Sequence, residues 1–334
     1  MKIVGFGDFL IHLSPEGNER FFQANSFKVS YTGAEANVCA ALGYWGADVG
    51  FVTRVPDHAL ANRGISNLRA LGVDTSGCAI GKERLGVFYL ENGTSLRPSS
   101  VIYDRFNSSI TEASYEDFDW DRILSDADML YLTGITPVLS DKLYEICKKL
   151  LPEAKKRGVQ VAYDVNFRPT LTTPQRAGEI LREFAPYITT LIGNEEHLKM
   201  LLGISSEYGE DETEKRLTDI TDKTRAILGV DRIAVTVRRT LSASDAIVFA
   251  SLSQNGEFAV SGRHQIHVVD RVGSGDAFSA GIIYSVINNL PTDEAINFAA
   301  ASNAMKHTIL NDINYATVDE IKRLATDKSM DVKR

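Results

Sequence analysis

The sequence predicts an α/β fold, in which a doubly wound, mainly parallel sheet is flanked by helices and carries a small β-sheet lid. Two observations support this prediction: strands and helices alternate along most of the chain, and two hairpin-like excursions interrupt its first third. The 334 residues are 44% hydrophobic, which is enough for a substantial core. We expect a core of residues 1–10, 33–83 and 108–334, and a discontinuous lid of residues 11–32 and 84–107.

The alternation is clearest between residues 128 and 202. Apolar strand patterns at 129–133, 160–164 and 190–193 are separated by helical patterns at 140–157, 174–184 and 195–202. Further helices are expected within 32–43 and at 59–71, 277–287, 293–306 and 318–325. The first excursion has strand-like pieces at 20–23 and 26–29, and the second turns at Asn92-Gly93 between runs at 85–91 and 100–105. The acidic segment 205–214 is interpreted as a solvated loop.

Composition narrows the possible partners. The 36 Lys and Arg against 44 Asp and Glu give a net charge of −8, which argues against nucleic acid or an anionic membrane as a partner. An anionic substrate must therefore be bound by local arginines. Cys39, Cys78 and Cys147 are scattered and odd in number, so we expect neither disulfides nor a zinc site, and we predict a cytoplasmic protein. The start of the chain has the pattern of a strand, and no apolar run approaches the roughly 20 residues of a membrane span.

The most informative stretch is a glycine turn that leads directly into a helix. Gly273, Ser274 and Gly275 can present backbone N–H groups at the positive end of the helix dipole, where phosphate binds favourably. Asp276 at the mouth of this turn is suited to accept a proton, although a simple helix-start role is equally compatible with the residues alone. Because Asp164 and Asp276 both follow strands, we expect them to face one crevice beneath the lid.

Two segments resemble the signatures of the ribokinase-like (PfkB) carbohydrate kinases. They are Gly273-Ser274-Gly275-Asp276 with the preceding Asp270, and Thr32-Gly33-Ala34-Glu35-Ala36-Asn37. The resemblance extends over residues 2–324. Four further stretches resemble the 2-keto-3-deoxygluconate kinases of this family: Leu13-Ser14-Pro15, Tyr103-Asp104-Arg105, Asp164-Val165-Asn166-Phe167-Arg168-Pro169 and Lys306-His307-Thr308-Ile309.

The resemblance implies roles for residues at the sugar. Asp276 would be the general base, and Gly273, Ser274 and Gly275 would form the anion hole for the transferred phosphoryl group. The sugar would be bound by Asp8, Gly33, Ala34, Asn37, Tyr89, Tyr103, Arg105 and Arg168. For Gly33 and Asn37 the alternative is close packing at a helix start, and tyrosines on strands are often core residues. The two arginines would hold a carboxylate through their guanidinium forks.

The resemblance also implies ATP and Mg²⁺ as cofactors. ATP would contact Asp164, Asn166, Arg168, Asn194, Thr236, Arg238, Gly273, Gly275 and Asn303, and Arg168 is therefore assigned to both ligands. Asn194 and Glu196 would reach Mg²⁺ through water. The sequence departs from the family at His197, where relatives have Glu, which leaves open whether Glu195 or Glu196 serves the metal. A second departure, Arg271-Val272, argues against potassium activation.

The implied activity is ATP-dependent phosphorylation of the terminal hydroxyl of 2-keto-3-deoxygluconate. A fructokinase or another ketose or sugar-acid kinase is the alternative within the family. A non-catalytic sugar-binding regulator is the alternative from another class, but it would be expected to lose the base or the glycines. A dinucleotide-binding oxidoreductase is disfavoured because Gly5-Phe6-Gly7 lacks a third glycine. The exposed strand edges of the lid predict a homodimer or a higher homo-oligomer.

Overall fold

A ten-stranded mixed sheet forms the body of the protein. The computed structural model describes residues 1–326, and its sheet has the order β15-β14-β13-β12-β11-β10-β1-β4-β6, with β16 also paired to β14. The strands from β13 to β6 are parallel, and β14 to β16 extend this sheet in antiparallel fashion. The strands are β1 (Lys2–Phe6), β4 (Asp48–Val52), β6 (Val73–Asp74), β10 (Met129–Thr133), β11 (Gln160–Asp164), β12 (Thr190–Asn194), β13 (Arg232–Thr240), β14 (Asp245–Gln254), β15 (Glu257–Val260) and β16 (His264–His267).

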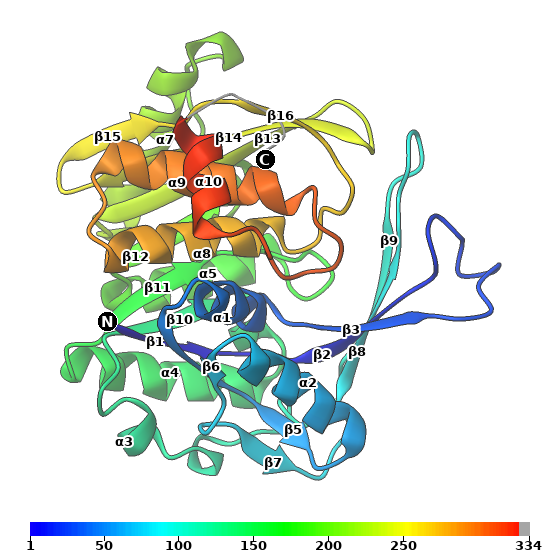
Figure 1. Cartoon of the computed structure of the whole chain (residues 1–334). Helices are drawn as coiled ribbons and strands as arrows, with labels where there is room; N and C mark the ends of the chain where they lie inside the picture. Colours follow the sequence, from blue (N-terminus) through cyan, green and yellow to red (C-terminus); the bar gives the residue numbers. More distant parts are fainter. Residues whose placement is uncertain (327–334) are drawn as a thin grey trace.

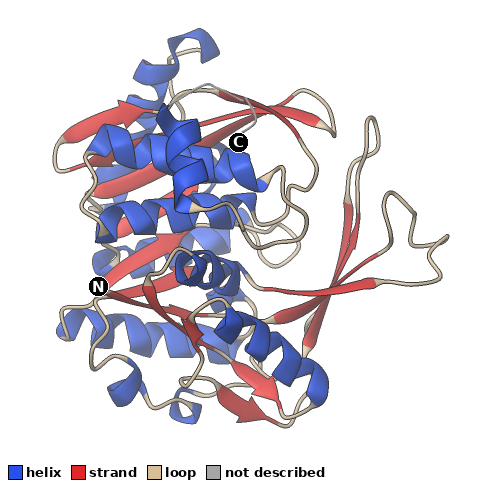
Figure 2. Ribbon diagram, in the orientation of Figure 1, coloured by secondary structure: helices blue, strands red, loops and turns tan. Residues whose placement is uncertain are grey.

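Helices cover both faces of this sheet (Figure 2), which confirms the doubly wound fold. Strand β10 shows why: Leu130 and Leu132 pack with residues of α4, whereas Met129 and Tyr131 belong to the core beneath α1 and α8. The helices are α1 (Ala34–Tyr44), α2 (Ala59–Ala70), α3 (Trp120–Ile123), α4 (Asp141–Lys156), α5 (Pro174–Phe184), α6 (Glu195–Leu202), α7 (Thr213–Leu228), α8 (Ser274–Ile287), α9 (Thr292–Lys306) and α10 (Val318–Thr326). None of the helices within residues 1–326 has the length and apolar character that a membrane crossing requires.

A separate four-stranded sheet forms the lid, which projects to one side of the body (Figure 1). Its strands are β2 (Leu10–Ser14), β3 (Lys28–Thr32), β8 (Gly86–Glu91) and β9 (Ser100–Asp104), in the order β3-β2-β8-β9. The small pair β5 (Arg54–Pro56) and β7 (Ala79–Gly81) lies apart from both sheets. The strand expected at 20–23 is wrong, because residues 21–23 form a turn, and the strand expected at 26–29 overlaps only the first two residues of β3. In the observed hairpin Leu10 aligns with Thr32 and Ser14 with Lys28. The exact division between core and lid stays a prediction.

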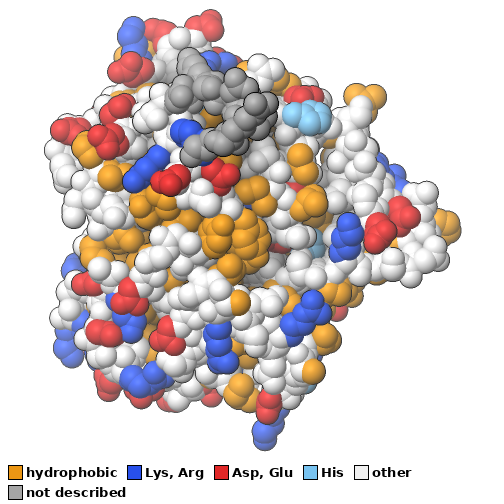
Figure 3. All heavy atoms as spheres, viewed as in Figure 1, with side chains coloured by type: hydrophobic (Ala, Val, Ile, Leu, Met, Phe, Trp, Pro, Cys, Tyr) orange, Lys and Arg blue, Asp and Glu red, His pale blue; other side chains and the backbone are white. Residues whose placement is uncertain are grey.

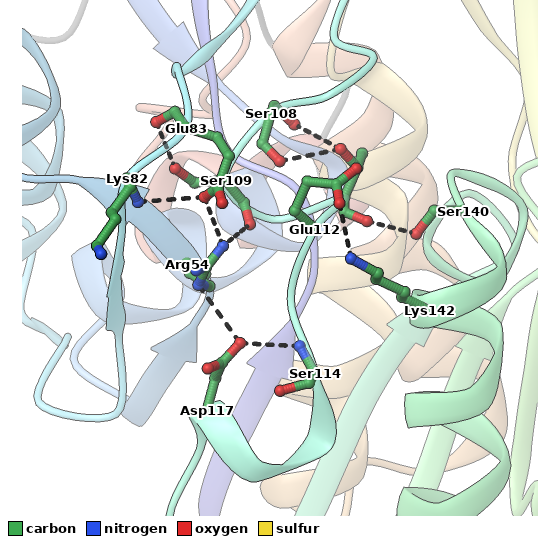
Figure 4. Close-up of polar contacts among 11 residues, drawn as sticks. Arg54, Lys82, Glu83, Ser108, Ser109, Glu112, Ser114, Asp117, Ser140 and Lys142 are labelled. Atoms are coloured by element: carbon green, nitrogen blue, oxygen red, sulfur yellow. Dashed lines mark hydrogen bonds and ion pairs between the residues drawn. The ribbon is translucent and has the colours of Figure 1, made fainter.

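Polar contacts fasten the base of the lid to the body (Figure 4). The Arg54 guanidinium donates to Glu83 at 2.7 Å and to the Ser109 carbonyl at 2.8 Å, and it faces Asp117 at 3.4 Å. Ser109 in turn donates to the Glu83 carbonyl at 2.6 Å. Because Glu83 precedes β8 and Ser109 follows β9, one partly buried arginine fixes both ends of this hairpin.

Candidate active site

A cavity of about 1010 Å³ lies between the lid and the carboxyl ends of the parallel strands. Asp164 and Asn194, the last residues of β11 and β12, lie on its wall, together with the N-termini of α1 and α8. Lid residues Leu10, Phe88, Tyr103 and Arg105 line the opposite side. The structure therefore brings the two sequence signatures, about 240 residues apart, to one cavity, as expected for an open parallel sheet.

The glycine turn forms the N-terminal end of α8. Gly273 has φ 78°, and a Cβ atom at this position would lie 1.9 Å from the Asp312 carbonyl oxygen, so only glycine fits. A Cβ atom at Gly275 would meet nothing within 4 Å, so this glycine leaves the space before the helix open. Gly273, Ser274 and Gly275 all line the cavity. Backbone N–H groups and the helix dipole make this a favourable phosphate site.

Asp276 lies beside this turn, with its carboxylate open to the cavity. Its Oδ2 accepts a 2.7 Å hydrogen bond from Asn37 Nδ2, and Asp276 lies in the first turn of α8. Burial raises the pKa of Asp276 to about 7, helped by the nearby Asp164 charge and opposed by the Asn37 bond. A carboxylate with such a pKa can accept a proton near neutral pH, so the geometry favours a chemical role over a simple helix start.

A buried ion pair lies at the lid end of the cavity. Arg105 Nη1 approaches Asp8 Oδ2 at 3.4 Å, and the two residues are 3% and 2% exposed. Arg105 Nε and Nη2, and Asp8 Oδ1, are buried without a hydrogen-bond partner. Burial raises the pKa of Asp8, an effect that the Arg105 charge opposes. These unused donors and this acceptor make the pair a ready site for a polar ligand.

Only one of the two expected lid tyrosines faces the cavity. Tyr103 packs beneath the Arg105 guanidinium, with 4.2 Å between the Arg105 Cζ atom and the ring centroid, and stacks on Phe88 at 5.0 Å. Tyr89 does not line the cavity and contacts Phe27 at a ring-centroid distance of 6.3 Å, so this structure does not bring it to the expected sugar site. Neighbouring residues of a strand face opposite sides of a sheet, and Phe88, the partner of Tyr103 in register, takes the cavity side.

The glycine of the first signature has a packing role. A Cβ atom at Gly33 would lie 2.1 Å from the Asp8 carbonyl oxygen, so this backbone contact requires glycine. Gly33, Ala34 and Asn37 nevertheless all line the cavity. Packing and ligand contact are therefore compatible at this helix start.

The cavity wall around the glycine turn also includes residues expected at the nucleotide. Asp164 accepts hydrogen bonds from Ser279 Oγ at 2.9 Å and from the Asn166 amide at 3.0 Å, and burial raises its pKa to about 6. Asn303 Nδ2 donates to the Ser274 carbonyl at 2.8 Å, while its Oδ1 is buried without a partner. The cavity wall also includes Arg168, Thr236, Arg238, Arg239 and Arg271. This concentration of cations suits an anionic ligand in a protein of net negative charge.

Segment 205–209 is a largely exposed loop, as expected, but it also belongs to this wall, whereas residues 210–214 are helical. Ser205, Ser206, Tyr208, Gly209 and Glu210 line the cavity. The helix that follows, α7, was not predicted at all, although Leu217, Ile220 and Leu228 lie at helical spacing and are buried. A polar composition alone did not distinguish a cavity wall from a solvated loop.

The expected metal residues occupy different environments. Asn194 caps α6, since its Oδ1 accepts from the His197 amide at 2.8 Å. Glu195 is buried beside Arg216 at 3.2 Å, whereas the exposed Glu196 pairs with Lys199 at 2.8 Å. Burial lowers the pKa of His197 to about 4, which keeps this ring neutral. Residues 1–326 contain no cluster of three His, Cys, Asp or Glu side chains that could hold a metal ion. These residues suit Mg²⁺ only where phosphate oxygens supply its main ligands.

Two cavity residues were not singled out from the sequence. Glu35 is fully buried, and its Oε1 accepts from the Thr133 amide and from the hydroxyls of Thr133 and Thr136 at 2.7–3.0 Å. Burial raises the pKa of Glu35 to about 7. Asp312, 1% exposed, lies in the loop after α9. Glu35 could have been identified from the sequence, because it is a charged residue inside the first signature. No local sequence pattern marked Asp312.

Comparison with known proteins gives consistent similarities over nearly the whole chain. The sequence matches the pfkB family carbohydrate kinases over residues 2–313. It is 30% identical to the 2-dehydro-3-deoxygalactonokinase of Haloferax volcanii, over 97% of this chain and 96% of the relative. It is 26% identical to the 2-dehydro-3-deoxygluconokinase of Thermoproteus tenax, over 91% and 88% of the two chains. The fold matches the crystal structure of the 2-dehydro-3-deoxygluconokinase from Thermotoga maritima with a TM-score of 0.94, at 39% identity and 98% coverage of both chains.

Proposed function

Since the chain belongs to the pfkB family of carbohydrate kinases, we propose that it transfers the γ-phosphoryl group of ATP to the terminal hydroxyl of 2-keto-3-deoxygluconate. The names of the similar proteins from Thermoproteus tenax and Thermotoga maritima support this substrate. The name of the Haloferax volcanii relative makes the galactonate epimer the alternative to test.

The unsatisfied Arg105 guanidinium is the observation that carries the choice of a sugar acid. A buried donor without an acceptor costs free energy, and Arg105 has two such nitrogens, Nε and Nη2. A carboxylate accepts two parallel hydrogen bonds from one side of a guanidinium, whereas a neutral ketose offers only hydroxyl and carbonyl oxygens. Asp8 Oδ1, also unpaired, can accept from a sugar hydroxyl. The pair therefore suits an acid that also carries hydroxyls.

The chemistry follows from the positions of Asp276 and the glycine turn. The sugar hydroxyl oxygen attacks the γ-phosphorus, a new O–P bond forms, and the bond from that phosphorus to the oxygen bridging the β- and γ-phosphates breaks, so that ADP leaves. Asp276 takes the hydroxyl proton. The amides of residues 273–275 stabilise the oxygens of the transferred group. When bound, Mg²⁺ neutralises phosphate charge, and Asn194 and Glu196 would reach it through water. Arg168, Thr236, Arg238 and Asn303 hold the nucleotide.

A coupled assay of ADP release tests this function. The panel consists of 2-keto-3-deoxygluconate, 2-keto-3-deoxygalactonate and fructose, each with ATP and Mg²⁺. We expect the highest kcat/KM with 2-keto-3-deoxygluconate. A preference for fructose would favour a fructokinase and reject the role given to Arg105. Sugar binding without ADP release would favour a non-catalytic regulator.

We further propose that two copies associate through the outer face of the lid. Phe27, Val29 and Ile102 are exposed apolar residues of the lid, at 39–52% of their surface. The face seen in Figure 3 mixes charged side chains of both signs with hydrophobic ones, and the latter also gather near its centre, on the body. Sedimentation of the purified protein tests this assembly, and a monomer at micromolar concentration would contradict it.

The three free cysteines within the described part of the chain support a location in the cytoplasm.

A further inference from the structure

Asp312 binds both strands of the first lid hairpin. Its Oδ2 lies 2.5 Å from His12 Nδ1 on β2, and its Oδ1 accepts a 2.8 Å hydrogen bond from Thr32 Oγ1 at the end of β3. His12 and Asp312 are each 1% exposed. Both carboxylate oxygens are thus used by the lid, although Asp312 lies about 300 residues further along the chain. A buried carboxylate with two such partners anchors the hairpin strongly to the body.

The same contacts continue to the proposed base. Thr32 has one hydroxyl proton, which it donates to Asp312, so its oxygen can only accept from Asn37 Nδ2 at 3.2 Å. The same Nδ2 donates to Asp276 Oδ2 at 2.7 Å. The donor and acceptor roles in this series of hydrogen bonds therefore fix the orientation of the Asn37 amide, since its nitrogen and not its oxygen must face Asp276. An Asn37 amide turned the other way would present an oxygen to a carboxylate, which is repulsive.

The main chain of Asp312 also abuts the glycine turn. Its carbonyl oxygen occupies the space where a Cβ atom of Gly273 would lie, 1.9 Å away. One residue thus contacts two lid strands and the proposed anion hole, and through Thr32 and Asn37 it reaches the proposed base. Both of its carboxylate oxygens are occupied by the lid, although the residue also lines the cavity.

We propose that Asp312 is a positioning residue, which holds the lid hairpin against the body so that Asn37 keeps its N–H group on Asp276. This inference rests on the proposed function, because it assigns Asp276 the role of base. It gives the lid a second role besides covering the sugar. A lid hairpin that leaves Asp312 also frees Thr32, and Asn37 then loses the contact that orients it.

Several charged groups near Asp276 also influence its pKa, and the test must leave them unchanged. Asp164 of β11, Asp312 and Arg168 lie near enough to influence it, and the buried Lys306 of α9 faces it as well. A change at Asp312 removes a charge from this group as well as a hydrogen bond. Thr32→Val is the cleaner variant because it keeps the shape and the charges, and removes only the hydroxyl between Asp312 and Asn37.

Steady-state kinetics of Thr32→Val therefore test the chain of contacts. We expect kcat to fall roughly tenfold and the acidic limb of its pH profile to move up by about half a pH unit, because the Asn37 bond no longer favours ionised Asp276. The KM for ATP should stay within about twofold, since this change leaves the nucleotide end intact. Thr32→Ser keeps the hydroxyl and should retain wild-type kinetics. Wild-type kcat and an unmoved limb in Thr32→Val would overturn the proposal.

A control in the same loop separates positioning from stability. Asn314 is also 1% exposed, but its side chain bonds to Ser302 and to the Ala316 amide, which belong to the body and not to the lid. Asn314→Ala should lower the midpoint of thermal unfolding and leave the pH profile of kcat unmoved. If the acidic limb shifts equally in Asn314→Ala and in Thr32→Val, the shift results from a general loss of stability, and the proposal is overturned.

Hydrogen–deuterium exchange of Asp312→Ala tests the lid directly and needs no activity. We expect faster exchange in residues 10–14 and 28–32, with unchanged exchange in β4 of the body. Unchanged exchange in the lid strands would contradict the proposal that Asp312 anchors the lid hairpin. Failure of the wild-type protein to phosphorylate any sugar acid would reject the proposed function, while the exchange result would still decide whether Asp312 holds the lid.

Discussion

The two ends of the cavity handle charge in different ways. At the sugar end, Asp8 and Arg105 are almost fully buried and leave three polar atoms unpaired. At the nucleotide end, Arg238 is exposed and Arg168 and Arg239 are half-buried. A wrong ligand that leaves buried polar groups unpaired loses much binding free energy, whereas the interactions of exposed cations are screened by water and salt. We therefore expect selectivity to depend on the end proposed for the sugar, and the end proposed for the nucleotide to contribute affinity.

The strongest test of the sugar end is Asp276→Asn. We expect kcat to fall by about 10²–10⁴-fold, because the amide cannot accept the hydroxyl proton. ATP binding, measured by calorimetry, should stay close to that of the wild type, since Asp276 is assigned to the sugar. Near-normal turnover with 2-keto-3-deoxygluconate would remove Asp276 from the role of base.

Arg105→Ala should have the next largest effect. We expect kcat/KM for the sugar acid to fall roughly 100-fold, because the change removes the fork and leaves Asp8 buried without its partner. Arg84→Ala is the matched control, since Arg84 bonds to Asp104 of the lid but is exposed. Kinetics with fructose complete the test: an equal loss for fructose would remove the support for a carboxylate ligand.

The pH dependence of kcat should also reflect the sugar end. The pKa of Asp276 is raised to about 7, and its charged form is the one that takes the proton. The rate should therefore be high above pH 7 and fall about tenfold for each pH unit below it. Measurements from pH 5 to 9 at saturating substrates check this limb. The same limb in the residual activity of Asp276→Asn would assign it to another group.

The smallest effect is expected at the nucleotide end. Arg238→Ala should raise the KM for ATP about fivefold and leave the KM for the sugar unchanged, because the exposed guanidinium interacts with phosphate through water-screened contacts. Arg168→Ala sharpens the comparison, since the KM that rises tells which ligand Arg168 holds. A larger effect of Arg238→Ala on the sugar than on ATP would break the distinction between the two ends.

Local chemistry explains what was correctly anticipated. Helices α5 and α6 have the predicted bounds, because their apolar spacing and their Thr173 and Asn194 caps lie within a few residues. The glycine turn and Asp276 are contiguous, so their pattern is visible in the chain. The family could be identified for the same reason.

Other features depend on residues that are distant in the sequence. Strand register decides that Phe88 and not Tyr89 faces the cavity, and the fold of the chain brings segment 205–210 to its wall. Asp312 meets His12 across 300 positions, and Arg105 meets Asp8 across 97. The sequence by itself determined the alternation of strands and helices between residues 128 and 202 and the chemistry of the glycine turn, because both arise from neighbouring residues. Tertiary structure decided which buried charges are paired and which are left for a ligand, because that depends on the packing of the lid against the body.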